Sequence, residues 1–113
     1  MSNRKAKTDV LQGTLDVMIL QTLVSIGPSH GYSIAARLEQ MSGGALRLNM
    51  GTLYPALMRL EQRGLLRGAW NTTDNNRRAR YYSITPAGRR QLAIDRKAWD
   101  RMTSIMQRVL GQE

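Results

Sequence analysis

The sequence predicts a mostly α-helical fold with one small β-hairpin, and residues 49–84 are the part that indicates it. Their first half carries leucines at the i, i+4 and i+7 positions of one helix face, namely Leu53, Leu57 and Leu60. Residues 65–71 and 78–84 are predicted to be strands joined by the polar tip TTDNNR, and residues 45–48 to be a further short strand. A helix followed by an arginine-rich hairpin is typical of a winged helix-turn-helix.

Two more helices are expected before this segment. Thr14 is predicted to cap a first helix over residues 15–26, which a Gly-Pro pair ends. A second helix is predicted over residues 30–41, with Ser29 or His30 at its start. The first helix has little polar surface, which indicates that it is buried on most sides.

A long helix is predicted at the C-terminal end. Thr85 and Pro86 form an N-cap and N1 pair, and the helix is expected to run to about Leu110. Twenty-five residues of helix are roughly 37 Å long, more than the preceding small domain is expected to cover. The predicted organisation is a flexible basic arm (1–9), a winged helix-turn-helix domain (10–85), a dimerisation helix (86–110) and a tail (111–113).

The charge of the chain predicts an anionic partner. Its 113 residues include 17 Lys and Arg against 8 Asp and Glu, which gives a net charge of +9. Such a surplus suits nucleic acid or an acidic membrane surface, or it only keeps a basic protein soluble. Fourteen of the cations are arginine, the side chain suited to bidentate contacts with phosphate and guanine. Three of them cluster in the hairpin, which favours double-stranded DNA.

Several classes of function are disfavoured. With no cysteine, one histidine and scattered carboxylates, the chain offers neither a metal site nor a nucleophile beside a base, so no enzyme and no cofactor are expected. No apolar run approaches the ~20 residues of a membrane span. We expect no signal peptide and a cytoplasmic location.

The outer face and first turns of the third helix give the candidate DNA-reading residues: Asn49, Gly51, Thr52, Tyr54 and Arg59. Asn49 is equally explained as the helix cap. Tyr54 suits either a phosphate contact or packing against the first helix. Arg59 is predicted to face away from the leucine stripe, toward DNA. Small groups such as Gly51 would let the backbone approach a groove closely.

Two further sets are candidates for contacts with the DNA backbone. Tyr32 and Ser33 open the second helix, where free N–H groups attract phosphate, although Tyr32 also suits an inward position. His30 is better explained by a structural role in its turn. Three arginines of the hairpin are predicted to contact the backbone or the minor groove: Arg77, Arg78 and Arg80.

The long helix carries apolar side chains at near-heptad spacing, interrupted by Asp95. We expect this stripe to dock onto a second subunit and its first helix, rather than only onto its own domain. The predicted dimer residues are Leu15, Ile19, Leu92, Trp99, Met102, Met106 and Val109.

Nearly the whole chain, from Leu11 to about Leu110, resembles the PadR family of transcriptional regulators. Four segments carry the resemblance: LQGTLDVMILQTL, GPSHGYSIAARLEQ, GTLYPALMRLEQRGLL and RRARYYSITPAGRRQL. Their order and spacing are specific, and the single C-terminal helix resembles the shorter subfamily. The resemblance implies a homodimer that binds a near-palindromic operator, usually as a repressor of stress, efflux or transport genes.

Two other functions remain open from the sequence. Some members of the family bind flat aromatic compounds between subunits, and Trp99 would supply a stacking surface for a small hydrophobic effector. A tryptophan that only anchors the dimer explains Trp99 as well. The third alternative, a protein-interaction module without DNA binding, leaves the fourteen arginines without a role.

Overall fold

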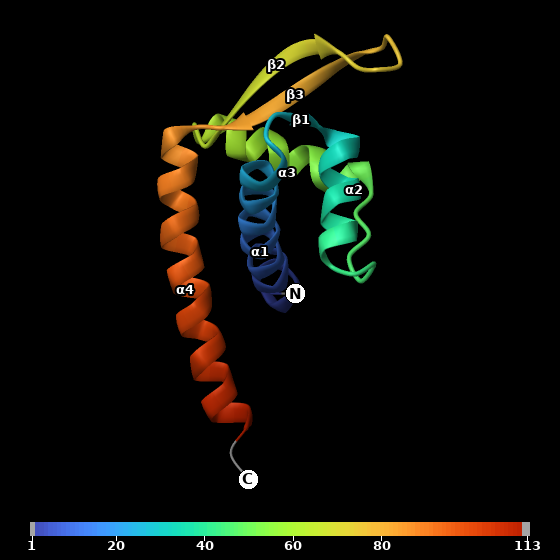
Figure 1. Ribbon diagram of the computed structural model, residues 1–113. Helices are drawn as coiled ribbons and strands as arrows, with labels where there is room; N and C mark the ends of the chain where they lie inside the picture. The colour runs from blue at the N-terminus through green and yellow to red at the C-terminus, as the bar shows by residue number, and fades with distance from the viewer. Residues whose placement is uncertain (1, 112–113) are drawn as a thin grey trace.

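The computed structural model describes residues 2–111, with side chains described from Gly13 onwards. Within this range four helices and three strands follow in the order α1, β1, α2, α3, β2, β3 and α4. The sheet lies across one end of the molecule, with α1 beneath it between α2 and α4 (Figure 1). This arrangement confirms the predicted mostly helical winged helix-turn-helix with a long C-terminal helix.

Helix α1 spans Ser2–Ile26 and begins well before the predicted start at Leu15. Thr14 therefore lies inside the helix and is not its cap, and that prediction was wrong. Half of the helix residues before it are good helix formers, among them Ala6, Lys7 and Leu11, so a threonine alone does not stop the helix from extending. The side chains of the predicted arm, residues 1–9, lie outside those that the structure describes, as do residues 112–113 of the predicted tail.

The third strand of the sheet is not where the sequence predicted it. Residues 45–48 form a loop, whereas β1 (Ser29–His30) pairs antiparallel with β3 (Arg78–Ile84). Ser29 lies opposite Tyr82 and His30 opposite Tyr81. A two-residue strand is defined by its partner rather than by its own pattern, which is why the local sequence did not reveal it.

Helices α2 (Gly31–Met41) and α3 (Met50–Gln62) form the helix-turn-helix. Helix α2 ends at two glycines with left-handed backbone, Gly43 at φ 66° and Gly44 at φ 84°. The hairpin follows at once: β2 (Leu66–Thr72) pairs with β3 in a regular antiparallel register, and its tip turns at Asn76, where φ is 61°.

Helix α4 (Pro86–Leu110) starts against the base of the hairpin. The Thr85 hydroxyl accepts from the Gly88 amide at 3.0 Å and donates to the Gly64 carbonyl at 2.7 Å, so the cap also ties α4 to the end of α3. Gly88 packs so closely that a Cβ there would overlap the Leu65 carbonyl oxygen. From this start α4 runs down past the end of α1 (Figure 1).

The hydrophobic core lies between α1, the helix-turn-helix and the base of the sheet. Its fully buried large side chains are Ile19, Leu20, Leu23, Ile34, Leu53, Leu57 and Leu60. No helix of the described residues is long and apolar enough to cross a bilayer.

Candidate nucleic-acid interface

Helix α3 has one face buried in the core and one face exposed. Leu53, Leu57 and Leu60 are fully buried in the core, as their spacing predicted. Gly51, Thr52, Pro55 and Met58 are exposed. The open face therefore carries small or uncharged groups over its first two turns, which lets another large molecule approach the backbone.

Asn49 caps α3. Its side-chain oxygen accepts from the Thr52 amide at 2.9 Å, and a Cβ on Gly51 would lie 3.2 Å from the same oxygen. The capping role is therefore confirmed, and it orients the first turn that carries Gly51 and Thr52.

The start of α2 places an exposed tyrosine beside this turn. His30 caps α2: its ring accepts from the Ser33 amide at 3.4 Å and lies 3.1 Å from the Ser33 hydroxyl through its other nitrogen. The ring also packs edge-on against Tyr81. Tyr32 is 68% exposed, so the alternative of an inward position was wrong. Ser33 is held by the histidine.

Tyr54 fills the space between α3 and the start of α2. A Cβ on Gly31 would lie 2.9 Å from the Tyr54 hydroxyl, so the glycine makes room for the ring. Tyr54 is still 37% exposed. The ring thus packs on its own domain while one side remains open to a partner.

Arg59 does not face away from the domain, and this expectation was wrong. Its guanidinium donates to Asp16 of α1 at 3.0 Å, and Arg63 lies 3.9 Å from the same carboxylate. Burial raises the pKa of Asp16, and the Arg59 charge and hydrogen bond, followed by the Arg63 charge, offset part of that rise. Arg59 therefore ties the third helix to the first.

Two of the three hairpin arginines point into solvent. Arg77 and Arg78 are exposed at the tip and at the start of β3, and the Arg78 guanidinium lies 5.2 Å from the centre of the Trp70 ring. Arg80, in contrast, bonds Glu61 of α3, a pairing that the sequence did not predict.

Trp70 is a candidate interface residue that the sequence-based prediction did not include. It lies on β2 opposite Arg80 and is 57% exposed. The signal available was a tryptophan within the predicted hairpin, because such side chains are usually buried or engaged by a partner.

These elements border one groove of about 900 Å³ between the start of α2, the side of α3 and the hairpin. Among its lining residues are Tyr32, Tyr54, Met58, Trp70, Arg77 and Arg78. Asn49 and Tyr32 border an adjoining hollow. The structure thus brings Tyr32, Tyr54 and the hairpin arginines together, while Gly51 and Thr52 lie on the neighbouring first turn of α3.

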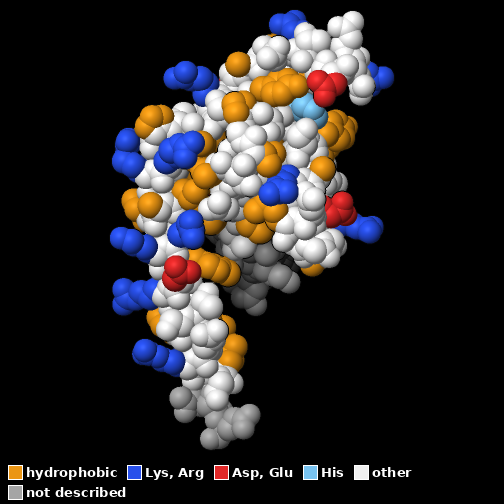
Figure 2. Space-filling model, in the orientation of Figure 1, with side chains coloured by type: hydrophobic (Ala, Val, Ile, Leu, Met, Phe, Trp, Pro, Cys, Tyr) orange, Lys and Arg blue, Asp and Glu red, His pale blue; other side chains and the backbone are white. Residues whose placement is uncertain are grey.

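Helix α4 exposes a separate apolar face. Trp99, Met102, Met106 and Val109 are 45–64% exposed, and hydrophobic side chains show along one side of α4 while Lys and Arg line the other (Figure 2). Leu15, Ile19 and Leu92 are buried in the core of this chain, so their assignment to a dimer interface was wrong. They pack in the core that α1 shares with the helix-turn-helix, β3 and the start of α4.

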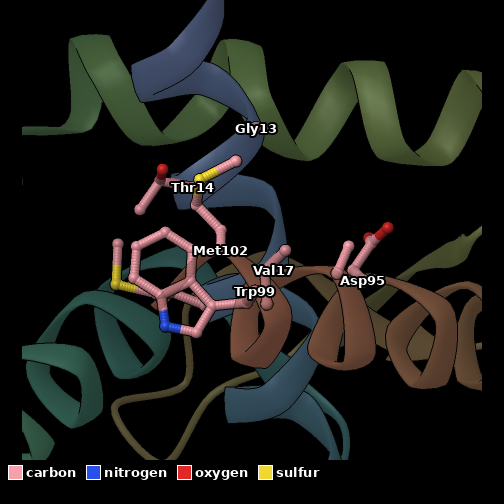
Figure 3. Close-up of a pocket in the computed structure, with 8 residues that line it drawn as sticks. Gly13, Thr14, Val17, Asp95, Trp99 and Met102 are labelled. Carbon is pink, nitrogen blue, oxygen red and sulfur yellow. The ribbon is translucent and has the colours of Figure 1, made fainter. Parts of the chain in front are cut away.

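A cavity of about 470 Å³ opens between α1 and α4. Trp99 and Met102 of α4 face Thr14 and Val17 of α1 across it (Figure 3). Its walls are largely apolar, and Asp95 at one side is bonded by Gln91 at 2.8 Å. Among the described side chains no cluster of His, Cys, Asp or Glu suits a metal ion.

Comparison with known families gives one clear match. Residues 19–94 match the model of the transcriptional regulator PadR-like family, which covers the helix-turn-helix, the hairpin and the start of α4.

Individual proteins agree with this match. The chain is 41% identical over 73 residues to the transcriptional regulator Rv3488 of Mycobacterium tuberculosis, which is 65% of this chain and 64% of that protein. It is 38% identical over 86 residues to an uncharacterised 37.1 kDa protein in transposon TN4556 of Streptomyces fradiae, which is 76% of this chain and 23% of that protein. The chain thus spans less than two thirds of either relative. A solved transcriptional regulator from Clostridium thermocellum superimposes with a TM-score of 0.79 at 28% identity, over 88% of this chain and 96% of that one.

Proposed function

The chain belongs to the PadR-like family of transcriptional regulators, and we propose that it acts as a homodimer that binds a near-palindromic operator in double-stranded DNA and represses the adjacent genes. It is a regulator rather than an enzyme. In this proposal the controlled genes serve stress responses, efflux or transport, and the protein works in the cytoplasm.

The observation that carries the DNA-binding proposal is the shared groove of the recognition helix and the hairpin. The exposed first turns of α3 carry no acidic side chain, and Arg77 and Arg78 stand beside them without an ion pair among the described residues. A helix of this kind enters the major groove by its N-terminal residues. The hairpin arginines then lie where the flanking phosphates pass.

The apolar face of α4 supports the homodimer. Soluble domains rarely leave side chains such as Trp99, Met102 and Met106 exposed in one row, because burial of apolar area is favourable. A second copy offers the same row, and a two-fold pair of α4 helices covers both. Two recognition helices related by that axis match an operator with inverted halves.

The test is selection of duplexes from a randomised pool by the full chain at physiological salt. We expect one enriched sequence with inverted halves, bound by two subunits and preferred over a scrambled duplex of equal composition. A pool without enrichment would exclude sequence-specific binding, as would equal affinity for the enriched duplex and its scrambled counterpart. Affinity that does not change with salt would favour a protein-interaction module instead.

A second candidate function is effector sensing, favoured by the cavity between α1 and α4. Its volume and apolar walls suit a flat hydrophobic molecule, and Trp99 supplies an aromatic face. Calorimetric titration with a planar aromatic dye tests this, with Trp99→Ala as the matched variant. Dye binding that depends on Trp99 and releases the selected duplex supports sensing. Equal dye affinity for both proteins removes Trp99 from the site.

A further inference from the structure

We propose that Arg80 is a brace that fixes the hairpin against the recognition helix and so sets where Trp70 and Arg78 meet the DNA backbone. This inference rests on the proposed binding of DNA. It assigns Arg80 a positioning role in place of the direct phosphate contact expected from the sequence.

The brace joins two elements that are separate along the chain. Arg80 lies on β3, and its Nη2 donates to Oε2 of Glu61 near the end of α3 at 2.5 Å. Both side chains are about two-thirds covered, at 32% and 30% exposure, so the pair is partly shielded from water and salt. The bond therefore holds the hairpin at a defined position over the helix.

Gly68 provides the path that Arg80 takes. In the β2–β3 register Trp70 is opposite Arg80, and Gly68 is opposite Tyr82. A Cβ on Gly68 would lie 2.6 Å from Nε and 2.8 Å from Cζ of Arg80. The guanidinium thus crosses β2 over the glycine on its way to Glu61. Any larger residue at this position would displace it.

Trp70 extends the brace to the exposed arginine. The Arg80 guanidinium lies 5.9 Å from the centre of the Trp70 ring, and that of Arg78 lies 5.2 Å from it. Both distances suit cation–π attraction. Because one indole is shared by the braced arginine and the exposed one, the position of Arg80 sets the position of Arg78.

Removing the charge of Glu61 distinguishes between two roles of this residue, because each role predicts an opposite change in DNA affinity. Glu61 lines the proposed DNA groove, where a carboxylate repels phosphates. If only the local charge mattered, Glu61→Gln would tighten binding to every duplex. If Glu61 holds the brace, the same change replaces a charge-assisted hydrogen bond with a weaker neutral one, loosens the hairpin and weakens binding to the selected operator.

The experiment measures Glu61→Gln on the selected operator and on a scrambled duplex at one salt concentration. We expect about a tenfold loss of operator affinity, the order of the difference between a charge-assisted and a neutral hydrogen bond, and a smaller operator-to-scrambled ratio. The matched control is Asp100→Asn, which removes an exposed carboxylate on the outer part of α4, away from the groove. In this control variant, the ratio of operator affinity to scrambled-duplex affinity should stay as in the wild type.

A double-mutant cycle links Gly68 to Arg80. Gly68→Ala should reproduce the loss of operator affinity, because its methyl group displaces the Arg80 guanidinium from Glu61. The fold should survive, since only the end of a flexible side chain has to move. It should cost nothing further in an Arg80→Ala background, since all the side-chain atoms that the new methyl group would displace are then absent.

The free protein supplies a readout that needs no DNA. In Glu61→Gln and Gly68→Ala, nuclear magnetic relaxation should show lower order parameters for the amides of residues 73–77, and the Trp70 indole signal should shift. If wild-type protein binds no duplex, the proposed function fails while this readout still tests the brace. Unchanged order parameters, or an operator ratio kept in Glu61→Gln, would overturn the inference.

Discussion

The arginines around the groove differ in what they contact. Arg59 and Arg80 each bond a carboxylate on another element, whereas no ion pair involves Arg77 or Arg78 among the described residues. A paired arginine holds the fold and contributes little net charge, while an exposed one is available to phosphate. Four side chains of one type thus have two roles, set by their neighbours.

Gly51 gives the sharpest single-residue test of the recognition helix. It is exposed on the first turn of α3, on the side opposite the buried leucines. Gly51→Leu should abolish discrimination between selected and scrambled duplexes, because the new side chain stands between the backbone and the groove. Sedimentation should stay as in the wild type, and thermal unfolding should show that the domain still folds. An unchanged affinity ratio would show that this turn is not in the groove.

Thr52 lies next to Gly51 on the same exposed turn of α3. Thr52→Ala should cost on the order of 1–3 kcal/mol of operator binding if the hydroxyl meets a base or an ordered phosphate. Competition between the selected duplex and single-base variants measures this cost. A loss equal for all sequences assigns the hydroxyl to the backbone.

Asp16 predicts a pH dependence of stability. Burial raises the pKa of its carboxyl above the ordinary 3.8, so the folded protein binds this proton more tightly than the unfolded chain. The stabilisation from that proton is complete below pH 3.8 and is lost as pH rises through the raised pKa. The stability of wild type relative to Asp16→Asn should therefore fall over this window. Urea unfolding at a series of pH values measures it, with Asp74→Asn at the hairpin tip as the control, and an opposite trend contradicts the assignment.

At the scale of elements, we propose that the hairpin adds phosphate contacts and that α3 reads the sequence. This division follows from the uncharged first turns of α3 and the two exposed arginines beside them. Backbone contacts strengthen binding to every sequence, and only groups on the base edges discriminate.

Arg77→Ala with Arg78→Ala should therefore weaken binding to all duplexes alike. The slope of log K against log salt should become shallower by about 0.9 for each phosphate that the hairpin no longer neutralises. The matched control is Arg101→Ala with Arg108→Ala, an equal change of charge on the outer part of α4. An equal change of slope in both variants would show that charge alone, and not the hairpin, sets the affinity.

At the scale of the whole molecule, charge and apolar surface are arranged along α4. This helix has six cationic and two acidic side chains, so it carries four of the nine net positive charges, and it leads away from the hairpin (Figure 1). The net charge of the chain is therefore larger than the positive charge available at the proposed DNA interface. The apolar side of the same helix is the surface that a second copy would cover.

Met106→Asp should convert the dimer to a monomer, since it places a charge in the exposed apolar row. Sedimentation at micromolar protein should show the change, and operator affinity should fall with it. Ile94→Asp is the matched control, because Ile94 is also exposed on α4 but lies about 120° around the helix from Met106. If the wild type is a monomer at this concentration, the proposed homodimer is wrong.

The sequence by itself determined the family and the local structure of α3, the hairpin and the start of α4, but not the start of α1 or the position of β1. The leucine period placed α3, the polar tip placed the hairpin, and Thr85 with Pro86 placed the start of α4, because periodicity and capping act within a few residues. Whether Trp99 binds an effector, and which residues touch DNA, stay predictions.

Only the tertiary structure decided which side chains remain free. The bond from Arg59 to Asp16 joins residues 43 apart, and that from Arg80 to Glu61 joins residues 19 apart. Likewise Leu92 became a core residue only because α1 and the hairpin base meet the start of α4. Helical spacing says which face a residue lies on but not what covers that face, since contacts between elements depend on how the whole chain packs.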